Sequence, residues 1–153
     1  MKKTLPIYII CLLAIPLFTT CKKSTTTTTA PATGISFKVD GVLTTMALAG
    51  ATMTNSGQTI TMSGNTNNGP YPALILTLRN PVVGTNTPVS LAYLVAANEE
   101  YIFTSGSESV IITSLTSSSV TGTFQFTGTT QFVTPVLTKT ITEGAFKCPV
   151  TQQ

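Results

Sequence analysis

Three cysteines and no histidine limit the chemistry that this 153-residue chain can perform. Ser-His-Asp triads, Cys-His pairs, zinc sites built from Cys and His, and haem ligation by histidine all lack a required residue. The sequence contains no Gly-rich phosphate loop and no GxSxG turn. An enzyme would have to use Ser, Thr, a carboxylate or a lysine, such as Lys139 or Lys147 beside a buried Ser. We therefore expect no catalytic residue, no metal and no cofactor.

Cys21 is the one residue whose surroundings predict a chemical modification. Lys2 and Lys3 precede an apolar stretch, residues 5–18, which is shorter than the roughly 20 residues of a membrane-spanning helix. The run Leu17–Cys21 (LFTTC) then resembles the lipobox of bacterial lipoprotein signals. In that motif the cysteine thiolate attacks a diacylglyceryl donor and leaves a stable thioether. We predict that residues 1–20 are a signal peptide and that Cys21 carries acyl chains such as palmitate, which hold the protein on a membrane. An ordinary secretory signal with an incidental cysteine is the alternative.

The predicted cleavage before Cys21 also determines which of the other two cysteines remains in the protein. Cys11 leaves with the signal peptide, Cys21 becomes a thioether, and Cys148 remains as the single thiol of the mature chain. Because no histidine can act as its base, we expect Cys148 to be a small packed residue rather than a nucleophile.

Residues 21–34 follow as a lipidated cysteine and a Thr-rich linker. The linker contains five consecutive threonines and no apolar periodicity, so we expect a disordered spacer. Lys22 and Lys23 lie where they would meet lipid headgroups, and no acidic cluster follows Cys21. This favours the outer membrane and its periplasmic side, although surface display stays open.

The remaining chain carries very little charge. Only 8% of all residues are charged, and residues 35–153 contain four basic and five acidic side chains, a net charge of −1. A protein that binds nucleic acid needs a basic surface, so nucleic acid is excluded as a partner. Thr, Ser, Asn and Gln supply the polar positions instead, and β-branched Thr suits a half-exposed sheet.

The pattern predicts one all-β domain over residues 35–150, with residues 151–153 as a tail. Asp40-Gly41 between two alternating runs is a strong hairpin signal. About eight to nine short strands, separated by turns and without helical periodicity, favour a single antiparallel β-sandwich or small barrel. The expected strands are 35–39, 42–48, 58–63, 73–79, 89–96, 100–104, 109–115, 119–127 and 136–142, with a short piece near Phe146.

Two sets of strand positions form the expected core. One set shares a face of the strand that contains two phenylalanines, and the other consists of three alternating leucines. They are Val120, Gly122, Phe124 and Phe126, and Leu74, Leu76 and Leu78.

Few residues qualify for binding a ligand. A calcium site would have to draw on the carboxylates of Asp40, Glu99, Glu100 and Glu108, but no loop has the dense ligand spacing of such a site. Glu99 and Glu100 are adjacent and should point to opposite faces of a strand.

Exposed aromatic rings could contact a carbohydrate or a protein partner. The chain contains no Trp, which leaves Tyr71, Tyr93 and Tyr101 as candidates. Tyr71 lies between two prolines, where we expect it to be exposed.

The lipobox, the opening FKVDG (37–41) and the closing pattern together resemble an uncharacterised domain family of small bacterial envelope lipoproteins. The closing pattern consists of VIIT (110–113), TGTFQF (121–126) and ITEGAF (141–146), similar to that family's "GTFxF" and "IT.G.F". The resemblance covers the ends of the domain and not residues 50–100. It implies an all-β fold and an envelope location, with Gly122 and Gly144 relieving crowding or forming bulges, but no functional residues.

The leading hypothesis is a non-catalytic binding or structural module anchored to an envelope membrane through Cys21. Its partner would be another envelope protein or a glycan, contacted by a polar sheet surface or a strand edge. The alternative is a small-ligand or lipid carrier with an apolar cavity inside a barrel.

Overall fold

Eleven strands make up most of the chain that the structure describes. The computed structural model describes residues 32–67, 69–131 and 133–153. The strands are β1 (Gly34–Val39), β2 (Val42–Met46), β3 (Leu48–Thr54), β4 (Thr59–Asn65), β5 (Ala73–Arg79), β6 (Gly84–Asn86), β7 (Pro88–Ala96), β8 (Glu99–Phe103), β9 (Ser109–Leu115), β10 (Ser119–Thr130) and β11 (Thr138–Gln152). Within these ranges the only helical turn is a 3-10 turn, η1 (Asn55–Gly57). The predicted all-β fold is therefore confirmed. None of the described helical segments is long and apolar enough to span a bilayer.

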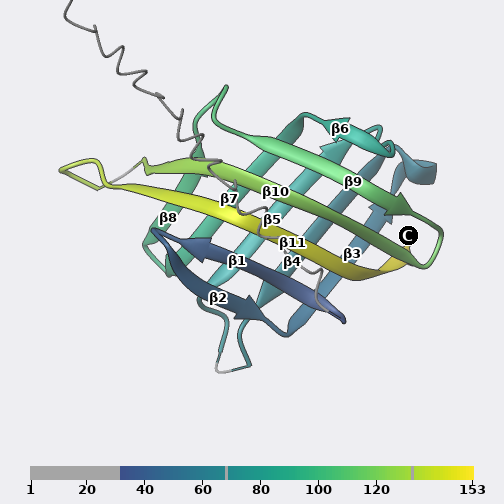
Figure 1. Cartoon of the computed structure of the whole chain (residues 1–153), viewed down its shortest axis with the longest axis horizontal. Helices are drawn as coiled ribbons and strands as arrows, with labels where there is room; N and C mark the ends of the chain where they lie inside the picture. Colours follow the sequence, from purple (N-terminus) through teal and green to yellow (C-terminus); the bar gives the residue numbers. More distant parts are fainter. Residues whose placement is uncertain (1–31, 68, 132) are drawn as a thin grey trace, which may run out of the picture.

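The strands form two layers that face each other (Figure 1). The front layer in Figure 1 has the order β2-β1-β11-β10-β9-β6, and the back layer has the order β3-β4-β5-β7-β8. The strands of the two layers cross at an angle rather than running parallel.

Two long strands join the layers into one closed sheet. The amino-terminal part of β11 pairs with β1 and β10 in the front layer, while its residues 150–152 pair with residues 51–53 of β3 in the back layer. Likewise, β10 pairs with β9 and β11, and its last residues pair with β8. The ring therefore consists of β3, β4, β5, β7, β8, β10 and β11, and it combines features of a sandwich and a barrel. The pairing of β11 with β3 is parallel, so the expectation of a purely antiparallel sheet was wrong.

The predicted first hairpin is present. Val39 pairs with Val42, and the intervening Asp40 and Gly41 have φ values of 49° and 86°. These left-handed values are those of the tight two-residue turn that Asp-Gly favours.

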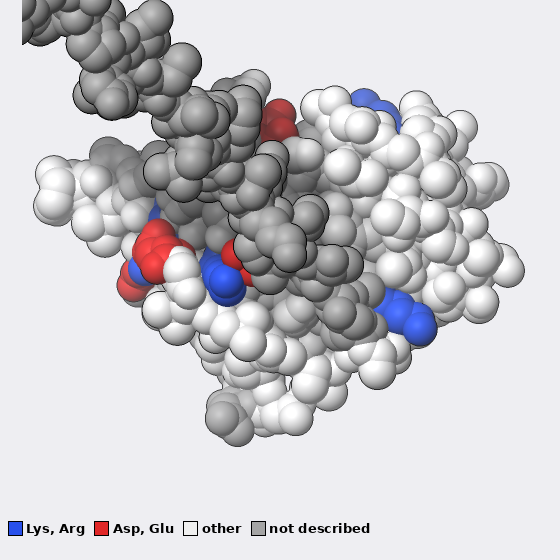
Figure 2. Space-filling view, in the orientation of Figure 1, with Lys and Arg blue, Asp and Glu red and all other residues white. Residues whose placement is uncertain are grey.

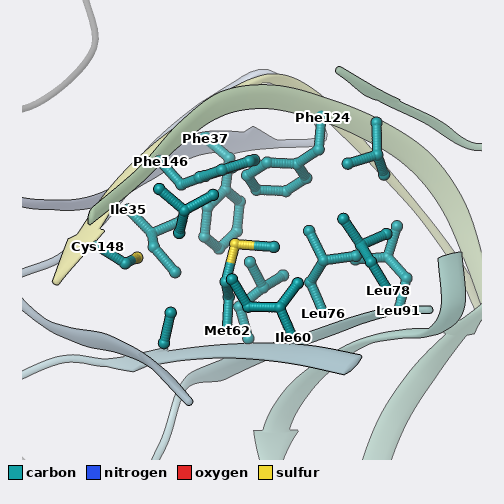
Figure 3. Packing of buried hydrophobic residues seen from close by; sticks show 14 of the residues in the cluster. Ile35, Phe37, Ile60, Met62, Leu76, Leu78, Leu91, Phe124, Phe146 and Cys148 are labelled. Carbon is teal, nitrogen blue, oxygen red and sulfur yellow. The ribbon is translucent and has the colours of Figure 1, made fainter. Parts of the chain in front are cut away.

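The core lies between the two layers (Figure 3). Phe37, Phe124 and Phe146 extend from the front layer, and Ile60 and Met62 meet them from the back layer. The Phe37 ring lies 5.8 Å from that of Phe124, and the Phe124 ring lies 6.3 Å from that of Phe146. The core residues expected from the sequence are all buried: Leu74, Leu76, Leu78, Val120, Gly122, Phe124 and Phe126.

Gly122 and Gly144 permit this close packing. A Cβ atom on Gly122 would collide with the Ile111 carbonyl oxygen and the Phe146 ring. A Cβ atom on Gly144 would lie 2.7 Å from the ring of Phe124. Both glycines relieve crowding, as expected from the sequence.

The first differences from the sequence prediction concern β2, β3 and β6. The expected run 42–48 ends at Met46, because the chain then leaves the front layer and begins β3 at Leu48. β3 contains Ala49, Gly50 and Ala51, which have low strand propensity, so it was not expected. The three-residue β6 was also not expected.

At the carboxyl end, residues 138–142 of the expected strand, the piece near Phe146 and residues 151–152 of the expected tail belong to one strand, β11. The strand continues through both Gly144 and Pro149. β11 contains a bulge. Phe124 pairs with Gly144 and Phe126 pairs with Ile141, so Gln125 of β10 lies opposite two residues of β11. One of these two residues, Glu143, has a φ of 51°.

Candidate functional site

Three connections meet at one end of the molecule, the end at which β1 finishes. They are the Asp40–Gly41 turn, the β7–β8 turn and the connection between β10 and β11. Asp40 donates its backbone N–H to the carbonyl oxygen of Thr140, and Thr130 of β10 pairs with Tyr101 of β8. Strand pairing therefore brings together residues that are about 100 positions apart in the sequence.

Four side chains at this end form what we call the rim cluster: Asp40, Glu99, Tyr101 and Lys139. The Tyr101 hydroxyl donates a hydrogen bond to Glu99 Oε1 at 2.7 Å. Lys139 Nζ lies 5.3 Å from the centroid of the Tyr101 ring, a cation–π distance, and 3.6 Å from Asp40 Oδ2. Asp40 Oδ1 also accepts the backbone N–H of Thr140 at 2.9 Å.

Burial controls the ionisation of the two tyrosines at this end. Tyr101 is only 2% exposed, and burial, together with the hydrogen bond and charge of Glu99, raises its pKa to about 12. The pKa of Tyr93 is also raised, first by burial, while a hydrogen bond with Thr44 opposes this shift. Tyr101 is therefore a neutral hydrogen-bond donor near pH 7, not a base.

Two adjoining hollows open beside the rim cluster, with volumes of about 350 Å³ and 370 Å³. They share Ala97, Asn98 and Val133. The remaining lining residues are Glu100, Thr130 and Gln131 in one hollow, and Ala96, Glu99 and Leu137 in the other. Apolar walls therefore stand next to carboxylate and amide groups that can accept hydrogen bonds from hydroxyls or amines.

Opposite charges lie close together at the same end of the molecule. Figure 2 shows a mixed group of red and blue atoms at the left, while separate red atoms lie at the top and separate blue atoms at the upper right and right. A second ion pair joins Lys38 Nζ to Glu143 Oε1 at 2.9 Å, and Lys38 lies on β1 two residues before Asp40. The bulge in β11 places Glu143 in this pair.

The structure places the tyrosine candidates differently from the sequence expectation. Tyr93 is 6% exposed and Tyr101 is 2% exposed, so their rings belong to the core and do not form a stacking surface. The Phe37 ring packs against the Tyr93 ring with centroids 5.5 Å apart. Tyr71 is only partly exposed, rather than exposed as expected.

The acidic candidates separate into different environments. Glu99 points toward Tyr101, whereas Glu100 is exposed, in agreement with the expected opposite orientations. Glu108 precedes β9 and does not join the rim cluster. Within residues 32–67, 69–131 and 133–153, no group of three or more His, Cys, Asp or Glu side chains could hold a metal ion.

The structure describes only one of the two cysteines Cys21 and Cys148. Cys21 lies outside the described residues. Cys148 lies on β11 with no exposed surface and forms no disulfide with a described residue. Burial raises the pKa of its thiol to about 11, which fits a packed side chain.

The wall residues Val133 and Leu137 were not recognised as site residues from the sequence, and Lys139 was considered only as a possible catalytic lysine. The available signal was the scarcity of charge, because residues 35–153 contain only nine charged side chains. Their convergence with Glu99 depends on the pairing of β10 with both β8 and β11.

Comparisons with protein-family models, curated proteins and solved structures found no match to this chain. The functional argument therefore rests on the residues and geometry of the chain itself.

Proposed function

We propose that this chain is a membrane-anchored lipoprotein of the bacterial cell envelope that acts as a non-catalytic binding or structural module. Acyl chains on Cys21 hold it on a membrane, with the outer membrane favoured by Lys22 and Lys23. The partner is another envelope protein or a glycan.

The position of the rim cluster relative to the entry point of the chain carries this proposal. The chain enters the β unit at Gly34, and β1 leads directly from there to Asp40. The entry point and the rim cluster therefore lie at opposite ends of β1 (Figure 1). A lipid on Cys21 holds the entry end near the bilayer, so the rim and its hollows can face away from it.

The contacts within the rim cluster favour binding over catalysis. The Tyr101 hydroxyl is hydrogen-bonded to Glu99, and Lys139 is paired with Asp40. Each polar group already has a partner, which positions it and lowers its reactivity. The hollows beside the cluster supply the apolar walls and hydrogen-bond acceptors that a partner surface needs.

Crosslinking in living cells tests the proposal. The intact protein is crosslinked to its neighbours, and a Cys21→Ala variant serves as the unanchored control. One partner recovered in near-stoichiometric amount, and lost from the Cys21→Ala variant, is the expected result. Recovery of only abundant envelope proteins would contradict the proposal.

Variants of the hollows locate the contact. Glu100→Ala and Leu137→Ala change lining residues that are already exposed, so both proteins should fold. We expect both variants to recover less partner. Val83→Ala, at an exposed residue near β6, is the matched control and should recover the wild-type amount.

A further inference from the structure

The sheet has two open edges, and they differ in how well they are protected. The edge strands are β2 and β6. β6 contains only three residues, and the Asn86 side chain bonds the adjoining backbone: it accepts from Val82 N at 3.0 Å and donates to Val82 O and Gly84 O at 2.8 Å. β2 is five residues long and contains no charge, no proline and no bulge against β1. Natural edge strands usually carry such protective features, because a bare edge is a template for another strand.

The side chains of β2 strengthen this contrast. Val42 is 70% exposed and Leu43 is 67% exposed, which makes them the two most exposed large apolar residues described. Both residues belong to β2, the outermost strand of the front layer (Figure 1).

Strand geometry identifies which backbone groups are free. In a two-residue hairpin the residues that flank the turn, here Val39 and Val42, exchange both backbone hydrogen bonds. Alternation along the strand then directs the N–H and C=O groups of Leu43 and Thr45 toward the open side.

We propose that β2 pairs with β2 of a second copy of this chain, antiparallel and with Leu43 opposite Thr45. In this register the free N–H and C=O groups of both residues find partners on the other copy. The same strand serves both sides, so the contact is a closed two-fold dimer that continues the front layer across two molecules.

Charge on the neighbouring strands permits this approach. The charged groups of β1 and its turn are already neutralised, Lys38 by Glu143 at 2.9 Å and Asp40 by Lys139 at 3.6 Å. A second copy therefore meets no net charge beside β2, and two copies do not repel each other there.

The size of the contact and the length of the linker determine where the dimer forms. A pair of five-residue strands is smaller than the interface of about 1,200–2,000 Å² that a stable complex buries, so the dimer is weak in solution. The residues between Cys21 and Ala32 reach about 35 Å when extended, which lets both chains insert lipid and raises their local concentration. This last step rests on the proposed function, whereas the strand pairing does not.

Cysteine crosslinking tests the register. Leu43→Cys and Thr45→Cys proteins are made in the full-length lipidated chain, placed in phospholipid vesicles and oxidised separately and as a mixture. We expect the 43–45 disulfide in the mixture to form about tenfold faster than either homodimer. Preferential 43–43 or 45–45 linkage overturns the proposed register. Because Cys148 is buried, it should not react.

A charge placed on the edge tests the contact without oxidation. Leu43→Lys should weaken dimerisation in vesicles, measured by energy transfer between labelled copies, by about tenfold or more. Val83→Lys alters a similarly exposed residue (63%) near β6 and should leave dimerisation unchanged. Wild-type protein that stays monomeric in vesicles, or equal effects of the two variants, overturns the proposal. Retention on vesicles through flotation is measured on the same samples, so a failure of anchoring is distinguished from a failure of pairing.

Discussion

Tyr101 belongs to both the core and the surface. Its ring is buried, yet its hydroxyl reaches Glu99 and its face lies beneath Lys139. A single side chain thus connects the packed interior with the charged end of the molecule.

The raised pKa of Tyr101 predicts how stability depends on pH. Its pKa is about 12 in the folded protein against an ordinary value of 10.0, so the folded state holds the proton more tightly. The associated stabilisation is complete below pH 10 and is lost as the pH rises toward 12. Tyr101→Phe keeps the ring and should reduce this loss, measured as the free energy of urea unfolding between pH 9 and 12. An unchanged slope would show that another group controls alkaline unfolding.

Gly122 provides a second prediction for single residues. In Gly122→Ala the new methyl group meets the Ile111 carbonyl oxygen and the Phe146 ring, so we expect a destabilisation of about 1–3 kcal/mol in urea unfolding. Gly50→Ala is the control, because a Cβ atom there has no neighbour within 4 Å. Its effect should stay within about 0.5 kcal/mol. Equal effects of the two substitutions would contradict the packing argument.

At the scale of elements, β11 holds the two layers together. It pairs with β1 and β10 in the front layer and with β3 in the back layer. Its last residues, which resemble a dispensable tail in the sequence, complete the ring. Gln153 extends this contact by donating its backbone N–H to Met53 O at 2.9 Å.

Removing the end of β11 should therefore destabilise the whole protein. Deletion of residues 151–153 removes most of the backbone pairing with β3 and opens the edge of the back layer. We expect a loss of about 1–3 kcal/mol in the free energy of unfolding, because several hydrogen bonds of about 1 kcal/mol each disappear. Thr151→Ala with Gln152→Ala keeps the backbone and is the control. A truncated protein as stable as wild type would show that β11 does not close the ring.

At the scale of the whole molecule, the interior is occupied by its own side chains. Twenty-one buried residues form one cluster, among them four aromatic rings from both layers that lie within 6.3 Å of a neighbouring ring. This packing favours a binding module that uses its surface over the alternative of a lipid carrier.

Native mass spectrometry after gentle extraction tests this distinction. We expect the mass of the acylated chain without additional lipid, because buried side chains from both layers pack against one another in the described core. The Cys21→Ala protein, expressed without its signal peptide, is the control and should also carry no lipid. Retention of a stoichiometric lipid by the control would support the carrier instead.

The sequence by itself determined the fold class, the hairpin at Asp40-Gly41 and part of the core. Alternating apolar residues and turn-forming residues are local signals, and the buried Leu74, Leu76 and Leu78 followed from their spacing alone. The prediction of lipid attachment at Cys21 also comes entirely from the sequence.

The tertiary structure alone decided the closure of the sheet, the continuity of β11 and the composition of the rim cluster. Each depends on pairing between distant segments, since Asp40 meets Thr140 and Tyr101 meets Thr130 only after the sheet has closed. The sequence marked Tyr93 and Tyr101 as candidates for surface contact, but the direction of a side chain depends on which face of its strand is covered. That was decided by the second layer, which buried both rings and left only the Tyr101 hydroxyl to join the charged rim.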